Sequence, residues 1–349
     1  MRSYQLAAFG APLVEVEAQP PAPQGHEVLL RTLACGVCHS DVHLADGYFD
    51  LGGGNHIDLA RSLRLPRTLG HEIVGEVVAL GPDAAGVALG DARVAFPWIG
   101  CGTCSDCAAG REHLCGAPRA LGVNRDGGFA DHVLVPDPRY LFAFSPLSAA
   151  EACTLACSGL TAFSALRKAV PLADGAQALV IGAGGVGLSA IRLARAVLGV
   201  PVVVADPDER TWPLALAAGA SATIDPRADG AARELMKATG GGIAAVFDFV
   251  GSGDSFAFGF STLAKGGRLV VVGLMGGATA FSPAMLPMKS ATICGSFVGS
   301  LAEMGELMTL ARSGVLPAMP VTAWRLADVE AAVTDLRAGR VRGRAVVTP

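Results

Sequence analysis

Charged side chains are scarce in this chain of 349 residues, at 17% of the total, and aromatic side chains make up only 6%. The 27 Lys and Arg residues are outnumbered by 31 Asp and Glu residues. A surface that binds nucleic acid would need clustered cations, and a disordered chain would need less than the 51% of hydrophobic residues found here. No apolar run reaches the ~18–20 residues of a membrane span. We therefore expect a soluble protein of about two domains that binds neither nucleic acid nor membrane.

Cysteine and glycine are the abundant exceptions, with nine and 45 residues respectively. An odd number of cysteines in a chain long enough to bury a large core does not suggest a disulfide framework. The first ten residues also lack a basic segment followed by an apolar one, the pattern typical of a secretion signal. We expect a cytoplasmic protein whose thiols are free for metal binding or chemistry.

The two halves of the chain differ in their patterns. Up to about residue 155, short strands at residues 27–32, 73–80, 92–97 and 130–136 alternate with Gly and Pro. From residue 159, apolar strands at 178–182, 200–206, 222–225, 244–250 and 268–274 alternate with helices at 186–198, 209–218, 231–239 and 255–263. This alternation predicts a parallel sheet covered by helices on both faces, after an irregular β-rich half. Helices at 301–312 and 328–337 and a strand at 344–348 complete the chain.

A glycine-rich turn follows the first of these apolar strands. Gly182, Gly184 and Gly187 form the pattern G-x-G-x-x-G, in which a pyrophosphate approaches the backbone at a helix N-terminus. Asp206 ends the next strand. It follows the glycine turn by about 20 residues, the sequence spacing at which a carboxylate accepts hydrogen bonds from the ribose hydroxyls of NAD. The carboxylate would also repel the 2′-phosphate of NADP, although Arg210 lies close by. We interpret the turn as an NAD site rather than a glycine turn without a nucleotide.

Four cysteines lie within fifteen residues in the pattern C-x2-C-x2-C-x7-C: Cys101, Cys104, Cys107 and Cys115. Four thiolates close the coordination shell of a zinc ion and leave no position for a substrate, so we predict a structural zinc. The bacterial iron–sulfur pattern differs in its last spacing and its proline. A nucleic-acid-binding zinc ribbon would need more cations than Arg111 alone.

A second cluster of reactive side chains extends over residues 35–43, with two thiols, two imidazoles, a hydroxyl and a carboxylate. A redox dithiol at Cys35 and Cys38 would need a thioredoxin-like context that is absent, so we favour zinc. His71 and Glu72 precede a predicted strand, and Cys157 lies at the junction of the two halves.

The order of these motifs resembles that of the zinc-dependent medium-chain alcohol dehydrogenases, in particular the tetrameric microbial type, over essentially the whole chain. The resemblance implies an α/β protein with an irregular β-rich GroES-like catalytic domain (residues 1–157 and 298–349). It also implies a Rossmann domain with a doubly wound parallel sheet (residues 158–297). The activity that it implies is the reversible oxidation of primary or secondary alcohols by hydride transfer to NAD, with one catalytic and one structural zinc per chain.

The resemblance also implies roles for individual residues. Cys38, His71 and Cys157 would hold the catalytic zinc, with Glu72 as a transient ligand and Asp41 orienting His71. Ser40 and His43 would relay the proton, and Trp98 would form a wall of the substrate pocket. The residues expected to contact the cofactor are His39, Thr161, Gly182, Gly184, Gly185, Val186, Gly187, Asp206, Arg210, Val250, Leu274 and Arg344.

Some alternatives stay open at this point. Cys153 competes with Cys157 as a zinc ligand on spacing alone. For Trp98, a place in the hydrophobic core explains the residue nearly as well as a wall of the substrate pocket does. Residues 47–65 form a long loop that we interpret as a pocket lid or an interface segment. A zinc-free reductase would lack Cys38 and His71, and a zinc-stabilised scaffold would not need Ser40, His43 and Asp206 together. The edge strand expected at 292–299 predicts a homodimer or homotetramer.

Overall fold

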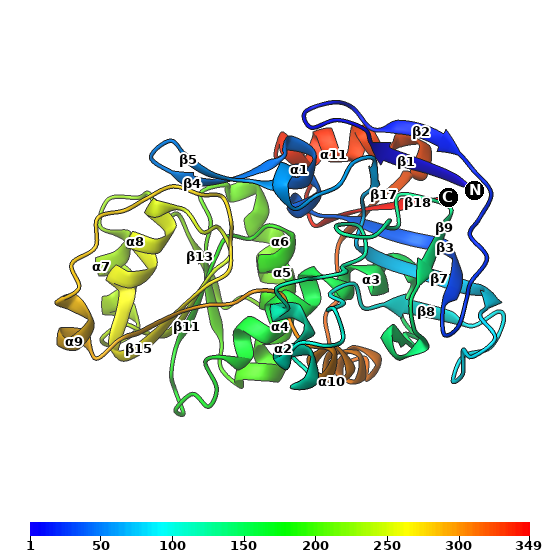
Figure 1. Cartoon of the computed structure of the whole chain (residues 1–349). Coiled ribbons are helices and arrows are strands. Elements are labelled where there is room, and N and C mark those ends of the chain that lie inside the picture. The colour runs from blue at the N-terminus through cyan, green and yellow to red at the C-terminus, as the bar shows by residue number, and fades with distance from the viewer.

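A computed structural model describes residues 1–349, and it has two parts built on two main sheets (Figure 1). The larger sheet has the order β10-β8-β7-β3-β18-β17, and β9 also pairs with β3. Its strands are β3 (Val28–Val37), β7 (Glu72–Leu80), β8 (Ala92–Ala95), β9 (His132–Val135), β10 (Leu141–Phe142), β17 (Val321–Arg325) and β18 (Arg344–Thr348). A smaller sheet of order β2-β1-β6 contains β1 (Arg2–Leu6), β2 (Val14–Glu17) and β6 (Arg67–Thr68).

The last strand of the chain returns to the first long one. Strand β18 pairs antiparallel with β3, in a register that sets Val347 opposite Cys35. Figure 1 accordingly shows the red C-terminal elements beside the blue N-terminal ones. The C-terminal strands therefore belong to the same sheet as the strands that flank the predicted metal ligands. The exact domain boundaries at residues 157 and 298 stay a prediction.

The second sheet is parallel throughout and has the order β13-β12-β11-β14-β15-β16. Its strands are β11 (Ala178–Ile181), β12 (Val202–Ala205), β13 (Ala222–Ile224), β14 (Ile243–Asp248), β15 (Leu263–Val271) and β16 (Thr292–Gly295). The order reverses between β11 and β14, which opens a crevice at the carboxyl ends of the strands where this fold binds nucleotides. The predicted doubly wound parallel sheet is confirmed.

Side chains that alternate along the central strands enter two separate cores. Val180 and Val204 join one core with residues of α5, whereas Leu179 and Val203 join the other with residues of α7 and α8. The strands are apolar on both faces because helices cover both faces. The helices of this part are α4 (Ser158–Arg167), α5 (Gly185–Leu198), α6 (Trp212–Ala217), α7 (Ala231–Ala238), α8 (Gly253–Thr262) and α9 (Met285–Lys289).

The remaining helices surround the β-rich sheet or join the two parts. They are α1 (His39–Asp46), α2 (Ser105–Ala108), α3 (Ala149–Cys153), α10 (Leu301–Arg312) and α11 (Val329–Arg337). Single 3₁₀ turns are η1 (Leu59–Arg61), η2 (Glu112–Leu114), η3 (Pro138–Tyr140), η4 (Thr154–Ala156), η5 (Glu209–Thr211) and η6 (Leu326–Asp328). No single helix has the length and apolar composition of a membrane span. One pair of helical segments, Ala149–Ala156 and Ser158–Arg167, has that length and composition only when the two are counted together, and the pair is bent by 50°.

Two sequence-based boundaries were wrong. The helix expected at 209–218 is interrupted, because η5 precedes α6 and Pro213 occupies the first turn of α6, where it has no N–H to bond. The edge strand expected at 292–299 ends at Gly295, where the chain leaves the sheet toward α10. Its position at the sheet edge is confirmed.

The segment 47–65, which the sequence predicts to be a long loop, contains regular structure. It forms a β-hairpin of β4 (Tyr48–Gly52) and β5 (Asn55–Asp58), in which Phe49 pairs with Ile57. Gly52, Gly53 and Gly54 all have positive φ, so the glycines serve the turn. The hairpin extends from the β-rich part to the nucleotide sheet (Figure 1), and a Cβ on Gly52 would lie 2.3 Å from the carbonyl carbon of Gly277.

This close approach can be tested with two substitutions that share the same backbone strain. Gly52 and Gly54 have φ of +81° and +80°, so alanine at either position costs about 1–2 kcal/mol in the left-handed region. Only Gly52→Ala also collides with Gly277, whereas a Cβ on Gly54 meets nothing within 4 Å. We expect faster hydrogen exchange of the amides at 276–278 in Gly52→Ala but not in Gly54→Ala. Equal exchange in both variants would contradict the contact.

Candidate metal centre and dinucleotide site

Three buried side chains from distant segments meet at the junction of the two parts. Cys38 follows β3, His71 precedes β7, and Cys157 precedes α4; their ligand atoms lie within 4.8 Å of one another. The antiparallel pairing of β3 with β7 sets Gly36 opposite Glu72, which brings Cys38 and His71 together. The structure thus brings together the three residues predicted for the catalytic zinc. Cys153 lies outside this group, and its thiol instead donates to the carbonyl of Ala150.

Asp41 fixes the orientation of this group. Its Oδ2 accepts the N–H of Cys38 at 2.9 Å, and its Oδ1 accepts the N–H of Gly70 at 3.2 Å. The same Oδ1 lies 3.3 Å from Nδ1 of His71. Both ring nitrogens of His71 are buried without a hydrogen-bond partner, and a ligand at Nε2, the nitrogen that faces away from Asp41, would relieve that costly state. The carboxylate therefore turns Nε2 toward the two thiols.

The donors fit a zinc ion. Two sulfur atoms and one imidazole nitrogen are the set that zinc takes in catalytic sites with three protein ligands. A hydrogen bond from Cys157 lowers the pKa of the Cys38 thiol well below its usual range, against the effect of its burial. A thiolate, the form that binds metal, is therefore favoured at Cys38.

Glu72 lies beside the three ligands but is engaged elsewhere. Its Oε1 accepts the N–H of Ser158 at 3.1 Å, and its Oε2 accepts a hydrogen bond from Arg344. Burial raises the pKa of the Glu72 carboxyl, and the charge of Arg344 opposes that rise. To act as the predicted transient ligand, Glu72 would have to release these partners.

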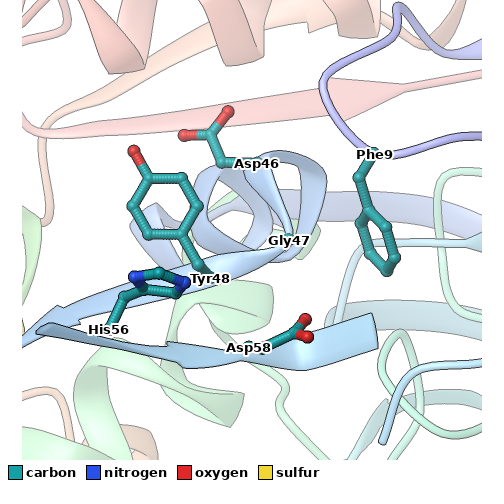
Figure 2. A pocket seen from close by; sticks show the side chains of 6 residues that line it. All are labelled: Phe9, Asp46, Gly47, Tyr48, His56 and Asp58. Atoms are coloured by element: carbon teal, nitrogen blue, oxygen red, sulfur yellow. The ribbon is translucent and has the colours of Figure 1, made fainter. Parts of the chain in front are cut away.

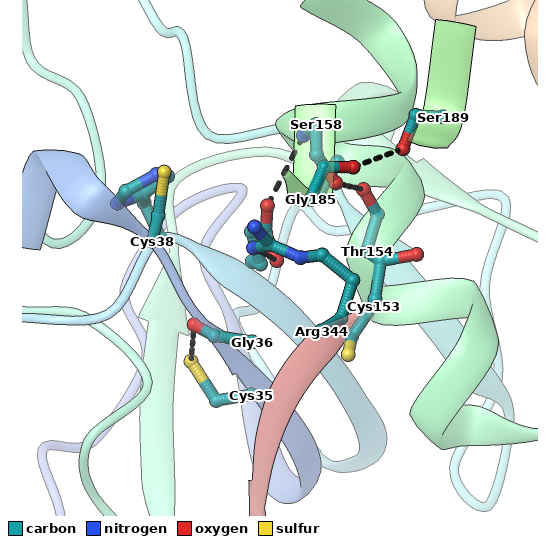
Figure 3. A network of polar contacts seen from close by, with 12 residues as sticks. Cys35, Gly36, Cys38, Cys153, Thr154, Ser158, Gly185, Ser189 and Arg344 are labelled. Atoms are coloured by element: carbon teal, nitrogen blue, oxygen red, sulfur yellow. Dashed lines mark hydrogen bonds and ion pairs between the residues drawn. The ribbon is translucent and has the colours of Figure 1, made fainter. Parts of the chain in front are cut away.

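Arg344 connects this centre to the nucleotide turn. Its side chain extends from β18 toward Ser158 and Gly185 (Figure 3), and a Cβ on Gly185 would lie 2.6 Å from its Nη1. The guanidinium is 4% exposed, and its Nε is buried without a partner. Arg344 is therefore adjacent to the turn, as a cofactor contact requires, while it also neutralises Glu72.

The four-cysteine lobe forms the second group of metal donors. Cys104 Sγ lies 3.5 Å from Cys107 Sγ and 3.7 Å from Cys115 Sγ, and all four sulfur atoms lie within 4.8 Å of one another. Backbone N–H groups of Cys101 and Ala117 donate to Cys115 Sγ, which suits a thiolate. His113 is outside the group. This arrangement fits a closed tetrahedral zinc site.

The glycine turn between β11 and α5 is as compact as its pattern predicts. Gly182 has φ of +90°, and a Cβ on Gly187 would lie 1.8 Å from the Gly182 carbonyl oxygen. Gly184 is the N-cap of α5, and a Cβ there would meet nothing within 4 Å. The turn therefore needs Gly187 for its own packing, and it leaves Gly184 open to a ligand at the helix N-terminus.

Asp206 lies at the carboxyl end of β12, where its Oδ2 accepts the N–H of Ala183 at 2.7 Å. This bond holds the carboxylate against the glycine turn. The predicted neighbour Arg210 does not contact Asp206, because its guanidinium pairs with Asp208 at 2.7 Å and points into solvent.

The other residues expected at the site lie around these two features. Ser40 Oγ is 3.8 Å from Cys38 Sγ, and His43 lies one turn further along α1 against Phe49. Burial lowers the pKa of His39 and of His43, so both imidazoles are neutral at pH 7.

The remaining expected cofactor contacts lie nearer the glycine turn. Thr161 donates its N–H to the Cys157 carbonyl, Val186 is in the first turn of α5, and Val250 lies against Gly182. Leu274 is 49% exposed after β15.

Trp98 lies against the metal donors. Its ring centroid is 5.2 Å from that of His71, and its Nε1 donates to the Ala156 carbonyl at 3.2 Å. It is buried and belongs to the main core, as one of the two interpretations expected; its role as a wall of the substrate pocket stays a prediction.

Sequence reasoning missed Asp248, which organises the turn after β14. Its Oδ1 accepts the N–H groups of Val250 and Gly251, both at 2.9 Å, and its Oδ2 accepts the hydroxyl of Ser255. A carboxylate at the end of an apolar strand followed by Gly and Ser was the available signal.

A cavity of about 440 Å³ lies outside these sites. It is lined by Phe9, Asp46, Gly47, Tyr48, His56 and Asp58, which Figure 2 shows around the hairpin. None of the metal donors or turn glycines lines it. The cavity follows from the way the hairpin leaves α1 and gives no support to a second catalytic centre.

Comparison with known proteins agrees with both parts of the predicted fold. Residues 24–145 match the alcohol dehydrogenase GroES-like domain, and residues 185–313 match the zinc-binding dehydrogenase domain. An NAD-dependent alcohol dehydrogenase of Sulfurisphaera tokodaii is 37% identical over 351 residues, with 100% of both chains covered. A D-arabinose 1-dehydrogenase (NADP(+)) of Saccharolobus solfataricus is 30% identical, with 99% of this chain and 96% of the relative covered. The crystal structure of the alcohol dehydrogenase from Aeropyrum pernix superposes with a TM-score of 0.89 at 31% identity, with 100% of both chains covered.

The glycine turn allows a test of its steric limits. We expect Gly187→Ala to force the turn apart and cost about 3 kcal/mol, which lowers the Tm by roughly 6–12 °C. Gly184→Ala introduces a methyl group into open space at φ −70° and should change the Tm by less than roughly 2 °C. Calorimetry of both variants without cofactor measures the difference. Similar melting of the two would mean that the turn is looser than described.

Proposed function

Because this chain belongs to the zinc-binding medium-chain alcohol dehydrogenases, we propose that it oxidises primary or secondary alcohols reversibly to aldehydes or ketones with NAD. The observation that carries the proposal is the adjacency of the Cys38, His71 and Cys157 donors to the glycine turn, through Glu72 and Arg344. A hydride acceptor bound at the turn and an alcohol at the donors would then share one cleft.

We propose that Cys38, His71 and Cys157 hold the catalytic zinc. When bound, zinc acts as a Lewis acid that makes the hydroxyl of an alcohol more acidic. Asp41 keeps His71 in the tautomer that offers Nε2 to the metal, because Nδ1 faces the carboxylate. Cys101, Cys104, Cys107 and Cys115 would hold a second, structural zinc.

The alcohol proton needs a path from the buried centre to solvent. Ser40 lies closest to the donors, and His43 is half-buried on the same helix. Burial lowers the pKa of His43, which favours the neutral imidazole, the form that can accept a proton. We therefore assign Ser40 and His43 as the relay.

We propose that the pyrophosphate of NAD binds at Gly184 and Gly185, where the N-terminus of α5 attracts anions. Arg344 stands beside Gly185 with an unpartnered Nε, which supports a contact with the same phosphates. His39, Thr161, Val186, Val250 and Leu274 are proposed as further cofactor contacts, and Asp206 as the ribose acceptor. Arg210 forms an exposed ion pair with Asp208, which gives no support to the predicted contact of Arg210 with the cofactor.

We also propose a homodimer or homotetramer that assembles through the exposed edge of β16, because an unpaired strand edge invites pairing. All nine cysteines are free, which supports a reducing, cytoplasmic location.

The metal assignment is tested by substituting two buried cysteines of one segment. Cys157→Ala should bind one zinc per chain instead of two and lose at least about 10³-fold in kcat, because one of three ligands is gone. Cys153→Ala, four residues earlier, should retain both zinc ions and near-normal activity. Elemental analysis and the initial rate of NAD reduction distinguish them. Full zinc in Cys157→Ala, or loss in Cys153→Ala, would refute the ligand set.

The cofactor preference is tested at Asp206. Asp206→Asn retains an acceptor for the Ala183 N–H and removes the charge that would repel a 2′-phosphate. We expect the ratio of kcat/KM for NADP to that for NAD to rise at least about tenfold. Asp328→Asn, which removes a charge of the exposed pair with Arg325, is the control and should leave the ratio unchanged. An unchanged ratio in Asp206→Asn would exclude Asp206 from cofactor selection.

A further inference from the structure

An ion pair that none of the motifs assigns joins the two parts of the molecule beside Asp206. Arg342 precedes β18 of the larger sheet, and Asp208 follows β12 of the parallel sheet, 134 positions earlier in the chain. Nη2 of Arg342 donates to Oδ2 of Asp208 at 2.9 Å, and both side chains are 29% exposed. The pair therefore spans the border between the two parts on the side where the proposed ribose acceptor lies.

Asp208 connects this pair to Asp206 through its backbone. The N–H of Asp208 donates to Oδ1 of Asp206 at 2.8 Å, while Oδ2 of Asp206 accepts the N–H of Ala183 in the glycine turn at 2.7 Å. Backbone groups thus fix both oxygens of the proposed ribose acceptor, and one of these groups belongs to the partner of Arg342. A shift of Asp208 would change the direction in which the Asp206 carboxylate faces.

Arg342 is held in place by its own segment. Its Nη1 donates to the carbonyl oxygens of Gly339 and Val341, at 2.6 and 3.2 Å. These bonds orient the guanidinium independently of Asp208, so little further side-chain entropy is lost when the ion pair forms. The pair is therefore firmer than an ordinary contact between two long surface side chains.

Gly343, between Arg342 and Arg344, anchors this segment to the chain that leads into β17. Gly343 has φ of +77°, and a Cβ there would lie 2.2 Å from the carbonyl oxygen of Pro320. The N–H of Arg344 donates to the same carbonyl at 2.9 Å. One rigid segment thus carries both arginines, the first at the proposed ribose acceptor and the second beside Gly185, where Figure 3 shows it. It sets the spacing between two proposed contacts of the cofactor.

The charges around the ion pair balance one another. Asp206 and Asp208 are carboxylates, and Arg210 and Arg342 are the two cations that pair with Asp208. The side chain of Arg210 is 77% exposed, so water screens its charge more than that of Arg342. Loss of Arg342 therefore leaves excess negative charge near the proposed NAD site, where it repels the anionic cofactor.

We propose that Arg342 is a positioning residue for the dinucleotide, which acts through Asp208 to hold Asp206 ready for the ribose hydroxyls. The inference rests on the NAD site proposed above and adds to it a residue from outside the nucleotide sheet. Arg342 stabilises the adenosine end of the bound cofactor, so its loss weakens the binding of NAD and NADH alike. Because partly exposed ion pairs contribute little, the change in affinity is about three- to fivefold.

The test measures cofactor affinity directly. When the zinc-loaded enzyme is titrated with NADH and the fluorescence is followed, Arg342→Gln should give a Kd about three- to fivefold above the wild-type value. Arg342→Lys retains the charge and should recover most of the affinity. Arg340→Gln is the matched control, since it removes a cation two residues earlier whose partner, Asp335, lies on α11 of the same part. The Kd of this control should be unchanged.

Two further measurements separate positioning from packing. ADP-ribose contains the adenosine end of the cofactor without the nicotinamide, so its Kd, measured by calorimetry, should rise by the same factor in Arg342→Gln. The KM for NAD should rise while kcat does not fall, because no reacting group is changed. In the background of Asp208→Asn, which removes the same ion pair, Arg342→Gln should cause no further loss of affinity.

Three outcomes would overturn the proposal. An unaltered Kd for NADH in Arg342→Gln would show that the pair does not hold the adenosine end. A full additional loss in the double variant would mean that Arg342 contacts the cofactor itself rather than acting through Asp208. A lower Tm together with a lower kcat would make Arg342 merely structural. A wild-type protein that binds neither NADH nor ADP-ribose would instead refute the proposed cofactor site, so the two failures are distinct.

Discussion

The buried ion pair between Glu72 and Arg344 is the interaction on which the arrangement of the site depends. Glu72 is fully buried, Arg344 is 4% exposed, and the two residues are separated by 272 positions in the chain. Removing both charges from water costs several kcal/mol per ion, and this cost is offset only by good geometry and further hydrogen bonds. Glu72 obtains such a bond from the N–H of Ser158.

Each partner of the pair belongs to a segment with a chemical task. Glu72 follows His71, Ser158 follows Cys157, and Arg344 lies against Gly185 at the start of α5. The pair therefore sets the distance between the metal donors and the nucleotide turn. A charge left alone at this depth would cost about 3–5 kcal/mol, so the pair restricts both segments to one arrangement. Gly36 makes room for it, because a Cβ there would lie 1.9 Å from Glu72 Oε2.

The sequence allowed the local parts of this site to be predicted. Thiols and imidazoles that are closely spaced in the sequence indicate metal binding directly. The strands around Val180 and Val204 are apolar on both faces, which indicates a parallel sheet covered by helices. Contacts between distant segments could not be predicted in the same way. Nothing near Arg344 indicates that β18 pairs with β3, and nothing near Arg342 indicates that it pairs with Asp208. The hairpin at 48–58 was also missed, because three glycines and several polar residues give it no alternating pattern.

The contact between the hairpin and the nucleotide sheet consists of main chain on both sides. Gly52 meets Gly277, and a Cβ on Gly276 would lie 2.5 Å from the carbonyl oxygen of Asp50 on the hairpin. Surfaces of this kind have no side-chain rotamers to immobilise, so their association carries almost no side-chain entropy cost. The fit of such a contact depends on the shape of the two backbones, and opening or closing it would change little side-chain entropy.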